Sequence, residues 1–450
     1  MNALKIKKGP VLLPLAVLVV ALAAYTVLNF RGVSAAGSLS LGQQYLNEMD
    51  YGGAVAAFTR AIELDPTSKE ARLGLARAYI GSENDDFARD MLEDMVYTQQ
   101  PDVDAVLELI ELLRRAGQLA QAVELSQILI DATDDDTYYT LQEELLAELA
   151  ARPRSLAVGT DQSLVIQNGQ VLSRGSNTLG QLGTDPAAVT ASEQYASAQY
   201  AGGTPVKVTC VGRTSFVVDA DGALWAAGEN RWGQMGEGYA ITAPQGGWVQ
   251  VPAPGAVADV AGTTGRLLVL LTDGSLWTVG AGSGQELERV TRFPVVVSLA
   301  SSQQYAAVLT ADGDLYRSSS QTPEQWELAA RDVSSFTISG SELYWVTKGN
   351  QLSSSGGYVA SAPDSWYDDL GNLVPEFYVH EMAQLNGVCL LTDGDGTLYR
   401  LPGDGTVEEV STPAAVTGLY VQGGTLVLEL EDGTAQTWNE ETGRLQALTV

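Results

Sequence analysis

Residues 215–236 read SFVVDADGALWAAGENRWGQMG, and this stretch decides the fold of most of the chain. The apolar run SFVVDA ends at Asp221-Gly222, and a second apolar run, ALWAAG, follows directly. An Asp-Gly pair between two such runs is a strong signal of a β-hairpin, because both residues accept the positive φ of a tight turn. The stretch is therefore predicted to form two antiparallel strands.

Hairpin signals of this kind recur along residues 155–450. Seven units share these 296 residues, which gives about 42 residues each, the size of a four-stranded propeller blade. The sequence therefore predicts an all-β, seven-bladed propeller over residues 155–450. The turns are marked by Asn168-Gly169, Asp221-Gly222, Asp273-Gly274, Asp312-Gly313, Lys348-Gly349, Asp395-Gly396 and Asp432-Gly433.

The first two units carry a longer signature, G-x-N-x-x-G-Q-x-G, at residues 175–183 and 228–236. Glycine suits backbone positions of positive φ, and Asn and Gln side chains suit hydrogen bonds to the backbone of a turn. The signature resembles the repeat of the regulator of chromosome condensation family, and the resemblance implies a seven-bladed propeller. The exchange activity of that nuclear family does not follow, because this chain is acidic and carries an export signal instead of a basic nuclear tail.

The ends of the propeller region predict how its ring is closed. The first unit begins at residues 155–159, SLAVG, with no obvious strand before it. The last residues, LQALTV at 445–450, supply a strand after the seventh hairpin. Pairing of these two ends is expected to close the ring, because it would hide both sheet edges from solvent.

A second repeat, of 34 residues, occupies residues 35–136. It resembles the tetratricopeptide repeat, in which small residues let two helices approach closely and Pro closes the unit. Residues 137–151 have an apolar stripe and are predicted to be a capping helix, so an all-α tetratricopeptide domain is expected over residues 35–151. The first copy has Leu41, Tyr45, Ala54, Phe58, Ala61 and Pro66, which recur as Leu75, Tyr79, Ala88, Leu92, Met95 and Pro101.

The N-terminus predicts export. Residues 9–30 contain no charge and, as a helix, would extend about 33 Å, enough to cross a bilayer core. The short basic segment 1–8 precedes them, and the positive-inside rule places it in the cytoplasm. A single-pass transmembrane signal anchor is therefore expected, with all later residues outside the cytoplasm. The alternative is a signal peptide cleaved after the small residues Val33-Ser34-Ala35, which would also export the chain.

Composition excludes several classes of function. The chain has 25 Lys and Arg against 55 Asp and Glu, a net charge of −30, so nucleic acid is not an expected partner. Its single histidine, His380, is predicted to be structural, and no phosphate-binding loop, nucleophile elbow or His-Glu-x-x-His motif occurs. Cys210 and Cys389 fall in non-adjacent blades and are predicted to be free thiols. A noncatalytic chain without cofactor or metal is expected.

Two surfaces are candidates for binding protein partners. The first is the concave groove of the tetratricopeptide array, where three arginines in an acidic array favour an anionic peptide; the alternative is that these arginines pair with acids of neighbouring helices. The groove residues are Gln43, Asn47, Arg77, Glu111, Arg114 and Arg115. The second is the inserted loop 361–378, whose aromatic residues suit an interface or a loop folded back on its own blade. These are Trp366, Tyr367, Phe377 and Tyr378.

Together these features predict a membrane-anchored, extracytoplasmic, noncatalytic scaffold that binds protein or peptide partners. The alternative is an extracytoplasmic enzyme that acts on glycan or peptide from one face of the propeller. Two carboxylates about 5–10 Å apart in a pocket on that face would favour the enzyme, because glycosidases use such a pair.

Overall fold

The computed structural model describes residues 34–98, 100–133, 135–236, 246–280, 286–348, 351–356, 379–401, 407–422, 424–439 and 441–447. These residues fall into two compact units, Met1–Leu112 and Leu113–Val450. The expected anchor at 9–30 and the basic segment 1–8 lie outside the described residues. From Ser34 onward, none of the described helices combines the length and the apolar character that a membrane crossing requires.

The first unit is built from consecutive antiparallel helices. Its core forms around Phe58, which is fully buried. A Cβ atom on Gly42 would lie 2.8 Å from the Phe58 ring, and one on Gly74 would lie 2.4 Å from it. The small residues Gly42 and Gly74 therefore make room for one large ring. The helices are α2 (Ala35–Asn47), α3 (Tyr51–Leu64), α4 (Lys69–Gly81), α5 (Asp85–Val96) and α6 (Val103–Arg115), whose last three residues belong to the second unit.

The second unit begins with two helices, α7 (Leu119–Ala132) and α8 (Thr137–Ala150), which the sequence assigned to the repeat domain. Both helices contact the propeller. Glu124 of α7 forms a largely buried ion pair with Lys348, and Ala150 at the end of α8 packs against a core cluster that contains Ala258 and Leu299. The compact units thus divide inside α6, whereas the sequence placed the domain boundary between residues 151 and 155.

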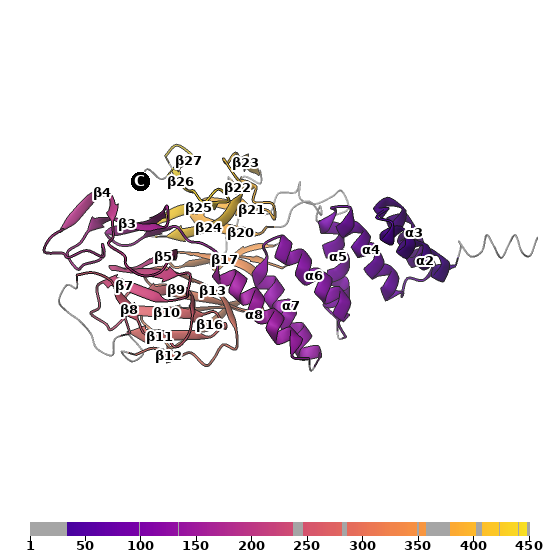
Figure 1. Ribbon diagram of the computed structural model, residues 1–450, viewed down its shortest axis with the longest axis horizontal. Helices are drawn as coiled ribbons and strands as arrows, with labels where there is room; N and C mark the ends of the chain where they lie inside the picture. Colours follow the sequence, from indigo (N-terminus) through magenta and orange to yellow (C-terminus); the bar gives the residue numbers. More distant parts are fainter. Residues whose placement is uncertain are drawn as a thin grey trace, which may run out of the picture. The chain divides into compact units, whose positions relative to one another are not determined.

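Seven antiparallel sheets follow, each built from strands consecutive in sequence (Figure 1). Blade one has β1 (Leu156–Val158), β2 (Gln162–Gln167), β3 (Gln170–Ser176) and β4 (Ala191–Ser197); blade two has β5 (Pro205–Val211), β6 (Thr214–Asp219), β7 (Leu224–Gly228) and β8 (Val249–Val251). Blade three has β9 (Val257–Thr263), β10 (Arg266–Leu271), β11 (Leu276–Gly280) and β12 (Glu288–Arg289); blade four has β13 (Val296–Ser301), β14 (Tyr305–Thr310), β15 (Leu315–Ser319) and β16 (Glu327–Ala330). Blade five has the described strands β17 (Val333–Ser339), β18 (Glu342–Thr347) and β19 (Leu352–Ser354). Blade six has β20 (Glu381–Leu385), β21 (Val388–Thr392), β22 (Leu398–Leu401) and β23 (Glu408–Val410); blade seven has β24 (Val416–Gln422), β25 (Thr425–Leu430), β26 (Ala435–Asn439) and β27 (Arg444–Ala447). The seven-bladed propeller predicted from the sequence is confirmed.

The predicted ring closure is wrong. Strand β1 pairs with β2 as the innermost strand of blade one, and β27 pairs with β26 as the outermost strand of blade seven. The two ends of the propeller chain therefore do not share a sheet. Blade one takes its fourth strand from β4, ASEQYAS, which is mostly exposed and lacks the apolar pattern by which a strand is recognised in a sequence.

The glycine and asparagine residues of the G-x-N-x-x-G-Q-x-G signature have the backbone and hydrogen-bonding roles that the sequence predicted. Gly228 ends the third strand of blade two with φ 114°, and a Cβ atom there would lie 2.4 Å from the main-chain oxygen of Arg213. Gly175 holds the same place in blade one with φ 111°. The side chain of Asn230 accepts a hydrogen bond from the main-chain N–H of Met235 at 3.0 Å and so fixes the loop after the strand. The signature is thus structural.

Candidate functional site

A central cavity of about 820 Å³ runs along the inner strands of the propeller. At one end it is lined by Leu119 of α7 and Leu146 of α8, which are both buried. At the other end it is lined by Thr160, Gln303 and Ser341, which are exposed and lie between the first and second strands of their blades. The cavity is therefore covered by helices at one end and reaches solvent at the other.

The charged residues of the cavity gather at its helix-covered end, where the inner strands begin. Arg154 precedes β1, Lys207 lies on β5, Asp259 on β9 and Glu381 on β20. The opposite end, where these strands finish, is lined by neutral Ser, Thr, Gln and Gly residues. We call Arg154, Lys207, Asp259 and Glu381 at the helix-covered end the ionic floor of the cavity. The solvent-facing end is polar and uncharged.

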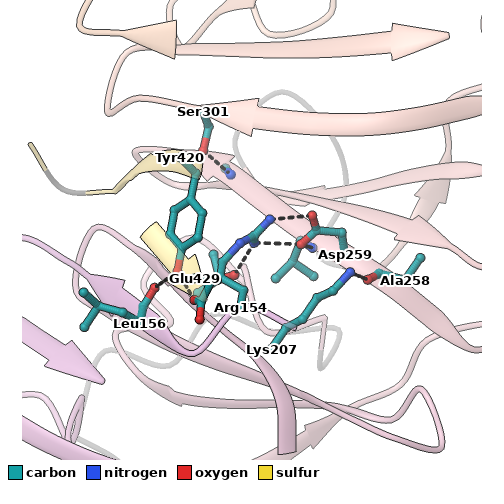
Figure 2. Close-up of polar contacts among 11 residues, drawn as sticks. Arg154, Leu156, Lys207, Ala258, Asp259, Ser301, Tyr420 and Glu429 are labelled. Atoms are coloured by element: carbon teal, nitrogen blue, oxygen red, sulfur yellow. Dashed lines mark hydrogen bonds and ion pairs between the residues drawn. The ribbon is translucent and has the colours of Figure 1, made fainter. Parts of the chain in front are cut away.

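Arg154 connects three blades (Figure 2). It donates to both carboxylate oxygens of Asp259 at 2.8 and 2.7 Å, donates to Thr209 Oγ1 at 3.0 Å, and lies over the ring of Tyr420 at 5.7 Å from its centre. Burial alone would raise the pKa of Asp259, but the charges of Arg154 and Lys207 outweigh burial and lower that pKa below its usual value. Both members of this ion pair are therefore charged at neutral pH.

Glu429 completes the closure of the ring between blades one and seven. It accepts hydrogen bonds from the main-chain N–H of Ser155 at 2.6 Å, from the Ser155 hydroxyl at 2.5 Å and from the Tyr420 hydroxyl at 2.5 Å. The same Tyr420 hydroxyl also lies 3.1 Å from the main-chain oxygen of Leu156. We call Arg154, Ser155, Asp259, Tyr420 and Glu429 the seam network, because they hold the two ends of the propeller chain together (Figure 2).

Lys207 lies beside the seam network and is almost fully buried, with 6% of the residue exposed. Its Nζ donates to the main-chain oxygen of Ala258 at 2.7 Å. Burial lowers the pKa of this ammonium to about 8; the charge of Asp259 opposes the decrease, and those of Arg154 and Arg152 add to it.

A second set of contacts joins the turn before α7 to blade six. The side chain of Arg152 and Nε2 of His380 both bond to the main-chain oxygen of Gly117, the His380 contact at 3.1 Å. Arg152 also pairs with Glu381 at 3.3 Å, and Glu381 accepts from the main-chain N–H of Leu419 at 2.6 Å. The single histidine therefore has a structural contact, as expected, between the helices and the propeller.

The predicted groove residues of α2 and α4 differ in their contacts. Gln43 and Asn47 are exposed on α2, and the Gln43 amide donates to Asn47 Oδ1 at 3.4 Å. Arg77 of α4 pairs with Glu108 of α6 at 2.6 Å. Arg77 is therefore paired with an acid of a neighbouring helix, which was the alternative to binding an anionic peptide.

The predicted groove residues of α6 lie near its C-terminus. Nε of Arg114 donates to the carboxylate of Glu148 on α8 at 2.9 Å, so this arginine is also paired with a neighbouring helix. Glu111 and Arg115 are exposed. Basic side chains in the last turn of a helix also stabilise it by offsetting the negative end of its dipole.

The remaining candidates from the sequence are the two cysteines, any metal ligands and the aromatic residues of the loop 361–378. Cys210 and Cys389 are free thiols, and burial raises the pKa of each to about 12. In the described ranges no group of three or more His, Cys, Asp or Glu is placed to hold a metal ion. The predicted interface residues Trp366, Tyr367, Phe377 and Tyr378 lie outside the described residues.

Sequence reasoning missed the residues of the ionic floor and of the seam network. A signal exists for three of them, because Lys207, Asp259 and Glu429 are charged residues inside strands whose other residues are mostly apolar. Lys207 lies in PVKVTCV, Asp259 in VADVAGT and Glu429 in TLVLEL. Charges in such buried strands require partners, so their occurrence predicts paired or ligand-binding groups.

Comparison with known proteins identifies the helical repeat. The tetratricopeptide repeat family matches residues 45–103, which confirms the resemblance of the helical region. A comparison with curated protein sequences gives no match.

Similar solved structures include human WBSCR16, at 14% identity and a TM-score of 0.48 over 59% of this chain and 83% of that one. They also include Prp20p of Saccharomyces cerevisiae, the yeast RCC1 protein, at 14% identity and a TM-score of 0.48 over 66% of this chain and 83% of that one. An RCC1 protein is thus among the similar solved structures. The likeness is one of fold alone, and nothing about partners follows from it.

Proposed function

We propose that this chain is a noncatalytic protein-interaction scaffold, anchored in a membrane by residues 9–30 and exposed outside the cytoplasm. The helical repeats and the propeller, both architectures that commonly bind proteins, support the interaction role. The sequence of the N-terminus supports the anchor and the export. In this proposal the exposed residues of the repeat groove and the loop 361–378 contact the partner.

One observation favours a noncatalytic role: the acidic side chains that line the cavity are already bound by other groups of the protein. Asp259 is bound by Arg154 through both carboxylate oxygens, and Glu381 is bound by Arg152 and by a main-chain N–H. A glycosidase needs one carboxyl that is protonated to act as acid and one that is free to attack or to activate water. The lowered pKa of Asp259 is the opposite of what the acid requires. These contacts favour the scaffold over the enzyme.

Deleting residues 1–31 is expected to move the protein from the membrane fraction to the soluble fraction. The reason is that residues 9–30 form the only long apolar run in the sequence. The measurement is fractionation of cells followed by quantification of the protein in each fraction. Deletion of residues 1–8 alone is the control and should leave the protein in the membrane fraction. A truncated chain that still pellets with membranes would contradict the anchor.

A photoreactive residue placed at Asn47 is expected to cross-link the full chain to a discrete protein or peptide partner. Asn47 is exposed and occupies a predicted groove position on α2. The control is the same residue at Arg60 of α3, whose side chain is 51% exposed but is not a predicted groove position. Adducts are identified by mass spectrometry after irradiation of membranes. Equal labelling of the same proteins from both positions would remove the groove from the proposal.

A further inference from the structure

Lys207 has fewer hydrogen-bond acceptors than a buried ammonium needs. An ammonium carries three N–H donors. In the part of the chain that the structure describes, Nζ of Lys207 has one acceptor, the main-chain oxygen of Ala258 at 2.7 Å. Unsatisfied buried donors are unfavourable, and more so when they carry charge. The position therefore suits an acceptor that comes from outside the protein.

The nearest acid does not supply this acceptor. Asp259 uses both carboxylate oxygens to accept from Arg154, at 2.8 and 2.7 Å (Figure 2). Among the described residues, no carboxylate oxygen forms an ion pair with Lys207 within 4.0 Å. Within the described ranges Lys207 is therefore a buried cation on the wall of a cavity, and no anion is in direct contact with it.

Thr209 provides a second donor beside Lys207. The two residues are separated by one position on β5, so their side chains lie on the same face of the strand. The Thr209 hydroxyl accepts from Arg154 at 3.0 Å, and its own proton is used in none of the contacts made by described residues. Both residues line the central cavity. An ammonium and a hydroxyl on one strand face form a natural pair of donors for one anionic group.

The cavity is large enough for a small molecule and can be reached by one. Its volume of about 820 Å³ lies within the range of small-molecule sites, roughly 300–1,000 Å³. Its neutral end is lined by exposed residues, so a ligand can enter there and place its charged group at the ionic floor.

We propose that the central cavity binds a small molecule bearing an oxyanion, a carboxylate or a phosphate, to which Lys207 and Thr209 donate hydrogen bonds. Charge-assisted hydrogen bonds of this kind are stronger than neutral ones. With a pKa of about 8, Lys207 is mainly protonated at neutral pH, yet it retains enough neutral amine to be labelled chemically. This role is separate from the binding of protein partners at the groove.

The site is tested by lysine labelling of the full chain with pyridoxal 5′-phosphate, an aldehyde that carries a phosphate. The neutral amine of Lys207 adds to the aldehyde carbon and water leaves, which gives a C=N bond. Borohydride then delivers hydride to that bond and leaves a stable secondary amine. The chain offers two matched controls: Lys69, which is exposed, and Lys348, which is ion-paired with Glu124. Peptide mass spectrometry locates the adducts.

We expect an adduct at Lys207 that falls at least tenfold with inorganic phosphate or succinate, relative to chloride at the same ionic strength. Labelling of Lys69 should not change, and Lys348 should be labelled least. The anion that protects at the lower concentration identifies the oxyanion as phosphate or carboxylate. An unlabelled Lys207 beside a labelled Lys69, or a Lys207 that neither anion protects, would overturn the proposal.

Two variants separate binding from labelling. Lys207→Arg keeps charged donors but cannot form the adduct, so the protecting anion should still raise its unfolding temperature. Lys207→Met lacks the donors, so the same anion should raise its unfolding temperature no more than chloride does. Equal stabilisation of the wild type and of Lys207→Met would place the anion elsewhere and refute the site.

Discussion

Replacing Asp259 by Ala is expected to lower the free energy of unfolding of the propeller by about 3–5 kcal/mol. The substitution leaves Arg154 as a buried charge without its carboxylate, and the side chains of this pair are only 19% and 14% exposed. Tryptophan fluorescence in urea measures the change, since all eight tryptophans of the chain lie within residues 155–450.

The control for this prediction is a second substitution in the same pair. Arg154→Leu combined with Asp259→Leu removes both charges, and replacement of a whole buried pair by apolar residues is often neutral. The double variant should therefore lose less than the sum of the two single losses. Glu408→Gln breaks the more exposed pair with Arg400 and should cost about 1 kcal/mol or less. An Asp259→Ala variant as stable as Glu408→Gln would show that Arg154 finds other compensation.

Replacing Phe58 by Ala is expected to lower the free energy of unfolding of the helical unit by about 3–5 kcal/mol. Phe58 is fully buried, and its ring fills the space that Gly42 and Gly74 leave open. The loss is a large fraction of the roughly 5–15 kcal/mol that stabilises a typical domain. Hydrogen exchange of the amides in α2 to α5 measures it, because exchange reports on the helical unit separately from the propeller.

Phe87→Ala is the matched control in the same unit. Phe87 is about half exposed and stacks on Tyr79 with ring centres 5.5 Å apart. Loss of this contact should cost on the order of 0.5–1.5 kcal/mol. If both variants lost protection equally, Phe58 would not be the centre of the helical core.

Much of the fold could be predicted because it depends on local chemistry. The Asp-Gly turns and Gly228 mark places where the backbone needs positive φ, and their regular spacing gives the number of blades. The repeat of small and large residues around Phe58 gives the helix pairs. Strand β4 could not be predicted, because its residues are polar and exposed and its place depends on pairing with β3. The error in the ring closure follows from that missing strand.

The candidate site could not be located from the sequence because its residues are distant in the chain. Asp259 lies 105 positions after Arg154, and Glu429 lies 274 positions after Ser155. Only the closed ring brings them together. For the groove arginines, the position on the helix could be predicted but the partner could not. Arg77 pairs with Glu108 and Arg114 pairs with Glu148, and both pairings depend on how neighbouring helices pack.

Blade one and blade seven are the first and the last blades of the ring, so no linker joins them along the chain, and the seam network connects them instead. Helix α8 ends at Ala150, only four residues before Arg154. Tension applied along the chain from the helices would therefore load the contacts of α7, α8 and Arg152 with the propeller first and the seam network next. Side-chain bonds that converge on Glu429 and Asp259 would bear that load, so mechanical opening of the propeller should begin between its first and last blades.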